Sequence, residues 1–242
     1  MLLEGAQSVT NVSDWGGFEE ELTVILEKAG LRKVDKDCNS EDNKKIFEYL
    51  QKIKPQIQDK TKPVLLKNEL YAKELKKDGT KNSAFKNFFV WQPYGSQNFP
   101  DFIIFTEKTI FSVEAKFSTK GRKKPIWNGN IPKQNSIYIF GSTSKTSRDL
   151  TIFKGSNIID EKATKALVDF WKEQDKLVKK FNSKMNELTN NGEVVNEGGF
   201  SPYLRQTYCQ HKLNNHSVID YFSNPKRKEW EQSVIDFVKE NE

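Results

Sequence analysis

Residues 98–118 read NFPDFIIFTEKTIFSVEAKFS and contain two short apolar runs separated by a polar stretch. β-branched and aromatic residues dominate both runs, which is typical of strands. The polar residues between them, Thr106 to Thr109, are few enough to form a hairpin turn. The stretch therefore predicts a β-hairpin, and Pro100 stands at the start of its first strand, one of the few strand positions that accept a proline.

Charged residues lie inside this hairpin, where the apolar neighbours predict burial. Side chains alternate across a strand, so Glu114 and Lys116 share one face while Phe111 and Val113 share the other. Pairing the strands about the turn brings Asp101 opposite the region of Glu114. Two neighbouring carboxylates repel each other, and their burial is costly unless a cation neutralises them. We therefore expect a Mg²⁺ site, because this ion prefers oxygen ligands and leaves positions for water and phosphate oxygens.

Lys116 adjoins the expected metal centre. A lysine whose pKa is lowered by burial and by a metal ion can orient or deprotonate a water, which suits metal-assisted hydrolysis of a phosphodiester. The spacing alone is unspecific, because residues 42–44, 74–76 and 160–162 match it too. Asp101 and the Glu114–Lys116 pair both lie in neighbouring apolar runs, which favours a metal site. The alternative is an exposed hairpin with a Glu–Lys pair on its solvent-facing side.

The chain around the hairpin predicts an α/β domain with a mixed central sheet of about five strands flanked by helices. An amphipathic helix is expected to begin after Ser13 or Asp14 and to stop at Gly30. The runs FFVW, DFIIF, TIFSVEAKF, SIYIF and LTIFKGSNII predict the strands. A closing helix is expected over the last dozen residues, and no linker divides the chain, so we predict one domain over 1–242.

Two further regions predict helices. Residues 41–76 hold two Lys-rich amphipathic stretches, with Pro55 and Pro63 between them. Residues 160–188 should form a single helix about 40 Å long, because its apolar residues recur at helical spacing. Core packing is the favoured interpretation of that apolar stripe. If part of the stripe is exposed, it would instead pair two copies in a homodimer, as suits enzymes that cut both strands of a palindromic site.

Pro100 and Asp101, followed by Glu114, Ala115 and Lys116, resemble the signature of the PD-(D/E)xK nuclease superfamily. The lead-in GSQNFPDF resembles type II restriction endonucleases of that group. The resemblance implies a restriction endonuclease-like fold with Mg²⁺ at the hairpin. It also implies that Asp101 and Glu114 are metal ligands, that the Ala115 carbonyl is a further ligand, and that Lys116 positions the attacking water.

Members of this family often add an acid from an N-terminal helix, just after an inward-facing aromatic or aliphatic residue. In GGFEEEL the matching position is Glu19, which follows Phe18, but Glu20 and Glu21 are its neighbours and the choice stays open. For each of the three, solvated helix surface is the alternative. The matching motifs cover about residues 16–30 and 92–160.

The charge balance favours a polyanionic partner. Lys and Arg number 39 against 33 Asp and Glu, a net charge of +6. Region 117–148 contains seven of the bases and no acid, which predicts DNA contact beside the metal centre. Region 200–212 offers a second surface. The candidate DNA-binding residues are Gln97, Ser118, Lys120, Arg122, Lys123, Lys124, Asn128, Asn130 and Arg205.

The leading hypothesis is a Mg²⁺-dependent, site-specific double-stranded DNA endonuclease of type II restriction type, leaving 5′-phosphate and 3′-hydroxyl ends. A DNA repair or junction-resolving nuclease and a noncatalytic DNA-binding protein are the alternatives. The apolar runs are too short to cross a bilayer, so no membrane association is expected. The two cysteines, Cys38 and Cys209, lie far apart, which predicts a reducing cytoplasm, and with two histidines they do not have zinc-ligand spacing.

Overall fold

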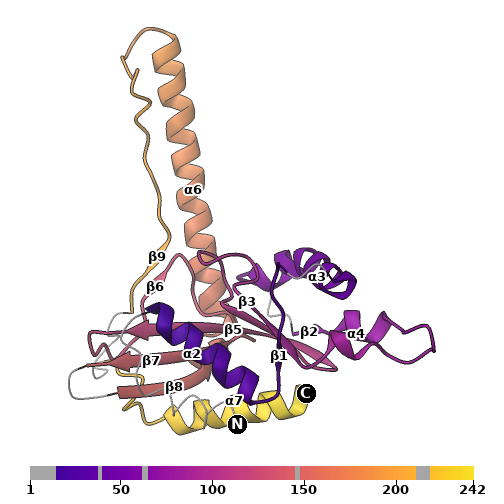
Figure 1. Cartoon of the computed structure of the whole chain (residues 1–242). Helices are drawn as coiled ribbons and strands as arrows, with labels where there is room; N and C mark the ends of the chain where they lie inside the picture. The colour runs from indigo at the N-terminus through magenta and orange to yellow at the C-terminus, as the bar shows by residue number, and fades with distance from the viewer. Residues whose placement is uncertain (1–14, 38–39, 62–64, 145–147, 211–218) are drawn as a thin grey trace.

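A central mixed sheet organises the protein (Figure 1). The computed structural model describes residues 15–37, 40–61, 65–144, 148–210 and 219–242. Seven strands form the sheet in the order β1-β3-β4-β5-β7-β8, with β2 paired to β5. Their bounds are β1 Arg32–Lys33, β2 Leu66–Lys67, β3 Phe88–Trp91, β4 Phe102–Phe105, β5 Thr109–Ser118, β7 Ile137–Thr143 and β8 Arg148–Lys154. The α/β class is confirmed, and the five longer strands lie in the five apolar runs. The end of the last run, GSNI, forms helix α5 (Gly155–Ile158) and not strand as the sequence predicted.

The sheet contains both parallel and antiparallel pairs of strands. β5 runs parallel to β7, and β1 runs parallel to β3, while the pairs β3/β4, β4/β5 and β7/β8 are antiparallel. A separate two-stranded ribbon joins β6 (Trp127–Asn128) to β9 (Thr207–Tyr208). Short helical turns complete the connections: η1 Ser83–Phe85 and α5 Gly155–Ile158.

Both faces of the sheet are covered. On one face α2 (Trp15–Lys28) packs its apolar stripe, from Phe18 to Leu26, against Val113 and Ala115 of β5. On the other face α3 (Glu41–Gln58) and α4 (Glu69–Lys73) pack over Phe105 and Ile110. The closing helix α7 (Arg227–Asn241) lies along β8, as the C-terminal sequence predicts. α3 continues through Pro55, whereas the sequence suggested a break there.

The β4–β5 hairpin has the expected register. Phe102 pairs with Val113, and Phe105 pairs with Ile110. The turn is closed by the Thr106 N–H, which donates to the Thr109 carbonyl at 3.0 Å. Because Asp101 immediately precedes β4, this register sets it opposite Glu114, so the predicted juxtaposition is confirmed.

α2 ends as the sequence indicates. Its last turn is followed by Gly30 at a φ of 88°, a left-handed conformation that glycine adopts without steric cost. The Leu31 N–H then donates to the Leu26 carbonyl at 3.1 Å, which closes the helix end. The proposed caps Ser13 and Asp14 lie outside the described residues.

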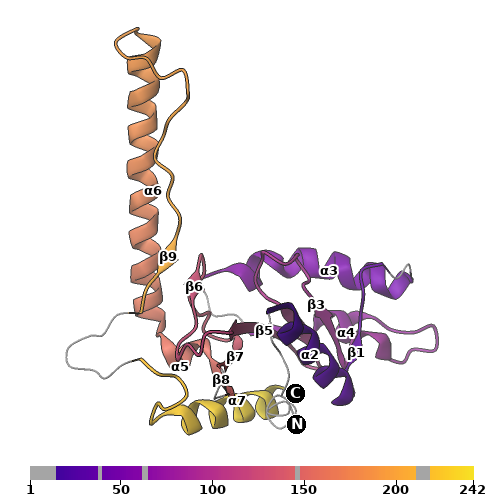
Figure 2. The same cartoon turned by 60° about the vertical axis from the view of Figure 1, so that its left-hand side comes forward.

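The long helix α6 (Glu161–Asn190) projects away from the sheet (Figures 1 and 2). Asp160 caps it, accepting the Ala163 N–H at 2.7 Å. Leu167, Phe170 and other residues of its apolar stripe are exposed, so the expected core packing is wrong. The periodicity of a sequence shows that a helix is amphipathic, but it does not show what covers the apolar side. Only the first turns of α6 lie next to the domain that contains the sheet. No helix among the described residues is long and apolar enough to cross a membrane.

Gly141 of β7 allows α2 to approach the sheet closely. A Cβ at this position would lie 2.9 Å from the Phe18 ring and 3.0 Å from the Phe117 ring. Gly141→Ala is therefore expected to lower the free energy of unfolding by about 1–3 kcal/mol, because overpacking forces the helix off the sheet. Urea denaturation measures the change.

Ser142→Ala is the matched control for that substitution. The Ser142 hydroxyl is buried and has no hydrogen-bond partner among the described residues, so its removal should leave stability unchanged or raise it slightly. Equal stability of Gly141→Ala and the unmodified protein would contradict the close-packing account.

Candidate functional site

Three acidic side chains and one lysine from separate elements line a single cavity of about 450 Å³. Glu19 comes from α2, Asp101 from the start of β4, and Glu114 and Lys116 from β5. The structure thus brings together all four side chains that the sequence proposed as catalytic. The rest of the wall consists of Ser96, Gln97, Asn98, Phe99, Phe117, Ile126 and Asn130.

Asp101 is held by the backbone of the neighbouring strand. Its Oδ2 accepts the Ala115 N–H at 2.7 Å. Burial first, and then the negative charges of Glu114 and Glu19, raise the pKa of Asp101 to about 8, against the opposing effects of the Ala115 N–H and Lys116. The Asp101 carboxyl group is thus poised to lose its proton when a cation arrives.

Glu114 and Lys116 form a buried ion pair. Lys116 Nζ lies 2.5 Å from Glu114 Oε1, and the two side chains are 18% and 8% exposed. The other oxygen, Glu114 Oε2, is buried and has no hydrogen-bond partner among the described residues. Burial of a carboxylate oxygen without a hydrogen bond costs free energy, because the oxygen loses its hydration. A bound cation would offset this loss.

Glu19 is the one residue of the GGFEEEL run that faces the cavity. It is 4% exposed, while Glu20 and Glu21 lie on the solvent side of α2. Glu19 Oε2 accepts hydrogen bonds from Trp91 Nε1 at 2.9 Å and from Gln92 Nε2 at 3.1 Å. The rotation of α2 that buries Phe18 against the Phe117 ring, with centroids 4.7 Å apart, determines this choice.

Sequence reasoning missed Trp91 and Gln92. Both residues stand at the end of β3, and no motif or spacing marks them. Their role follows only from the pairing of β3 with β4, in which Trp91 lies opposite Phe102, next to Asp101. The Gln92 N–H also donates to the Asp101 carbonyl at 2.7 Å, so this residue links two acidic positions of the site.

The basic loop that follows β5 begins and ends at the cavity. Phe117 and Ile126, which flank it, both line the wall. Lys120 and Arg122 are exposed on this loop. Two other candidate contacts have protein partners: Lys123 Nζ lies 3.0 Å from Asp149 Oδ2, and Lys124 Nζ donates to the Gln210 carbonyl at 2.8 Å. Ser118, at the end of β5, accepts the Lys120 N–H at 3.3 Å.

The two candidate DNA-contact regions are joined through the β6–β9 ribbon. Asn128 pairs with Thr207, and the Gly129 N–H donates to the Gln206 carbonyl at 2.9 Å. Arg205 is exposed beside this ribbon. Gln97 is exposed on the cavity wall, which Asn130 also lines. Residues 211–212 of the second region lie outside the described part of the chain.

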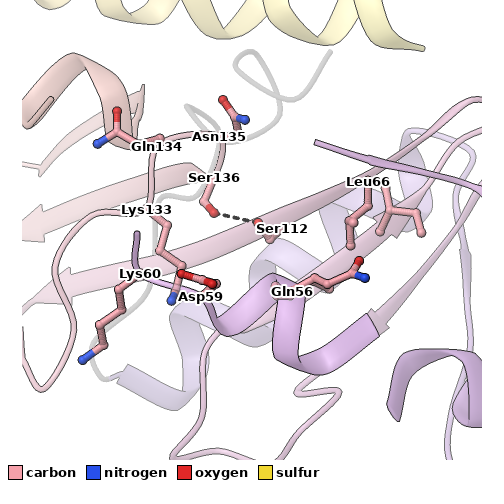
Figure 3. A pocket seen from close by; sticks show the side chains of 11 residues that line it. Gln56, Asp59, Lys60, Leu66, Ser112, Lys133, Gln134, Asn135 and Ser136 are labelled. Carbon is pink, nitrogen blue, oxygen red and sulfur yellow. Dashed lines mark hydrogen bonds between the residues drawn. The ribbon is translucent and has the colours of Figure 1, made fainter. Parts of the chain in front are cut away.

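Lys133 departs from the expectation for the basic region, because it is buried rather than part of a cationic surface. Its Nζ donates to the Gln58 carbonyl at 2.7 Å. Burial first, and then the positive charge of Lys60, lower the pKa of Lys133 to about 8, against the opposing effects of Asp59 and Glu114. Figure 3 shows Lys133 in a small pocket of about 30 Å³, where the Ser112 and Ser136 hydroxyls lie 2.7 Å apart. Of the other bases, Lys145 lies outside the described residues.

The donor chemistry of the cavity fits Mg²⁺. Asp101 and Glu114 offer carboxylate oxygens, and the unpartnered Glu114 Oε2 marks where positive charge is lacking. Among the described residues no group of three or more His, Cys, Asp and Glu side chains forms a ready metal cage. Mg²⁺ is commonly held by one or two carboxylates and keeps its other positions for water and substrate oxygens, and Asp101 and Glu114 can supply that number of carboxylates. A ligand role for the Ala115 carbonyl stays a prediction.

Comparison of the chain with protein-family models, with curated proteins and with solved structures gives no match. The chemistry of the site therefore has to follow from its own residues.

The raised pKa of Asp101 predicts a pH-dependent stability. Between its ordinary value of 3.8 and about 8, the carboxyl group holds a proton in the folded protein and loses it in the unfolded chain. Unfolding then releases a proton, so the stability of the metal-free protein falls as the pH rises through this window. Asp101→Asn keeps an acceptor for the Ala115 N–H and removes the charge. We expect it to raise the Tm by several degrees above pH 8 and to abolish any rise in Tm with Mg²⁺.

Thermal unfolding with Mg²⁺ or with a chelator, below and above pH 8, measures both effects. Asp149→Asn is the control, because it removes an acid of the same sheet that pairs with Lys123 and does not line the cavity. It should keep the full response to Mg²⁺. A Mg²⁺-dependent rise in the Tm of Asp101→Asn equal to that of the unmodified protein would contradict the assignment.

Proposed function

We propose that this protein is a Mg²⁺-dependent, site-specific endonuclease of double-stranded DNA. The observation that carries the proposal is the convergence of Asp101, Glu114 and Lys116 on one cavity together with the unpartnered Glu114 Oε2. Grouping desolvated carboxylates in one cavity destabilises the fold. A cation-dependent activity would explain why the protein has such a group. The resemblance of the hairpin to the PD-(D/E)xK signature supports the same reaction.

Each side chain has a distinct part in the proposed reaction. Asp101 and Glu114 would hold Mg²⁺, which when bound lowers the pKa of water and offsets the charge that develops on a phosphodiester. Lys116 Nζ, fixed by Glu114 Oε1, would hold a water by hydrogen bonding on the side of the cavity that it lines. Glu19, fixed by Trp91 and Gln92, would add negative charge to the cation site.

The substrate class follows from the surroundings of the cavity. Lys120 and Arg122 lie on a loop whose two ends line the wall, so a polyanion bound there would reach the acidic centre. The wall also carries the amide side chains of Gln97 and Asn130. Amides and guanidinium groups bond base edges as well as phosphates, which supports sequence-specific cleavage of a duplex.

Plasmid digestion tests the proposal. With Mg²⁺ we expect discrete fragments that carry 5′-phosphate ends, and none when a chelator is present. Lys116→Ala should lower the cleavage rate by about 10²-fold or more, as loss of a group acting on the reacting water does. Lys108→Ala, which removes an exposed lysine from the turn of the same hairpin, should leave the rate unchanged.

Because Lys116→Ala also leaves Glu114 without its ion-pair partner, circular dichroism should confirm that the variant is folded at the assay temperature. Unchanged cutting by a folded Lys116→Ala would contradict the proposed role. Preference for branched over linear DNA would favour a junction-resolving nuclease, and metal-independent binding without cutting would favour a noncatalytic DNA-binding protein.

The basic loop has its own test. The double substitution of Lys120 and Arg122 by Ala should weaken DNA binding by about 10-fold and reduce the slope of log affinity against log salt by about 2, since two phosphate contacts are lost. Substitution of Lys76 and Lys77 by Ala is the control, because these exposed lysines lie on the loop after α4, away from the cavity. Fluorescence anisotropy of a labelled duplex in chelator measures both. Equal losses for the two variants would contradict a specific role for the loop.

A further inference from the structure

The apolar stripe of α6 follows a heptad pattern. Positions 163, 167, 170, 174, 177, 181, 184 and 188 alternate in steps of four and three residues along the helix. Ala163, Leu167, Phe170, Leu177, Phe181 and Leu188 fill six of them. The remaining two hold Gln174 and Lys184. Alternating steps of this kind, sustained along a whole helix, are typical of a coiled-coil seam.

One flank of this seam is already covered by the chain itself. The half-buried residues Trp171, Val178 and Met185 share a face of α6 next to the seam. The segment 193–208 returns along α6 from its tip to the body (Figures 1 and 2), and at its end Tyr208 contacts Trp171, with ring centroids 6.2 Å apart. The returning segment therefore occupies the flank and leaves the seam open.

The seam itself is exposed to solvent. Phe170, Leu177 and Phe181 are 53%, 59% and 45% exposed. The charged residues around the helix pair within it, as in the ion pairs Lys165–Asp169 and Lys176–Glu173. A contiguous apolar stripe on a projecting helix marks an interaction surface, because isolated soluble proteins rarely expose one.

We propose that this seam pairs with the same seam of a second copy of the chain, antiparallel, in a two-fold symmetric coiled coil. In this register Phe170 packs against Phe181 of the second copy, and by symmetry Phe181 packs against Phe170. Gln174 then meets Leu177. Leu167 meets Lys184, whose aliphatic stem covers apolar surface while its ammonium group reaches water.

Charge complementarity favours the second copy and the antiparallel direction. The open flank of the seam carries Glu173, which also pairs with Lys176 of its own helix, and Lys180. In the antiparallel register Glu173 comes beside Lys180 of the second copy, and the contact occurs twice by symmetry. In a parallel pair the same residues would face the flank of Trp171, which Tyr208 of the returning segment contacts. The surface is thus self-complementary, and the inference does not rest on the proposed nuclease activity.

Sedimentation equilibrium of the full chain tests the pairing. The unmodified protein should dimerise at micromolar concentration, and Phe170→Ser with Phe181→Ser should raise the dissociation constant by at least about 100-fold, because two of the largest apolar contacts are lost on each side. These side chains are exposed in the single chain, so the variant should stay folded. Leu75→Ser removes a side chain that is 61% exposed and lies away from α6, and it should leave the dimer intact. A protein that is monomeric at all micromolar concentrations would overturn the proposal, as would equal effects of the two variants.

Cysteine cross-linking tests the direction in a background where Cys38 and Cys209 are replaced by Ser. Phe170→Cys combined with Phe181→Cys should give a covalent dimer on mild oxidation, whereas Phe170→Cys alone should not. Covalent dimer formation by the single variant would show a parallel pair and overturn the antiparallel assignment. Charge reversal adds an independent readout: Glu173→Lys or Lys180→Glu alone should weaken the dimer, and the two together should restore it. Single reversals without effect would likewise contradict the register.

Discussion

The Asp101 carboxyl group accepts the Ala115 N–H at 2.7 Å across the start of the β4–β5 hairpin, and this contact brings a half-buried acid against Glu114. The negative charges of Glu114 and Glu19 then act on a group that is already poorly hydrated, which raises the pKa of Asp101 to about 8. Lys116 pairs with one oxygen of Glu114, and the other oxygen has no hydrogen-bond partner in the described part of the chain. The hairpin thus fixes a local excess of negative charge that the chain alone does not fully compensate.

The packing of α2 connects this charge to the stability of the fold. Phe18 reaches the sheet because residue 141 has no side chain, and its ring stacks on Phe117. The next residue, Glu19, is thereby directed to the cavity, where Trp91 and Gln92 hold it. Phe18, which packs in the core, and Glu19, which lines the cavity, are consecutive in sequence. A change in the packing of α2 would therefore also move Glu19.

Two parts of the molecule extend beyond the sheet with different physical characters. The loop after β5 is basic and anchored at the cavity, which suits a polyanion close to the acidic centre. The arm formed by α6 and its returning segment balances its charges internally and exposes apolar side chains, which suits a second copy of the same surface. Substrate contact and self-association therefore occupy separate surfaces.

The sequence by itself determined the hairpin, the side chains that share each face of it, and the position of Asp101 opposite Glu114. The reason is that alternation along a strand and a short turn are local properties. It also determined the extent of α6 and the stop of α2 at Gly30. Only the tertiary structure decided that Glu19 rather than Glu20 or Glu21 faces the cavity, since the rotation of a helix depends on what it packs against. It likewise decided that Lys133 is buried and that the stripe of α6 is open, because burial is a property of neighbours distant in sequence and a periodic pattern does not name them.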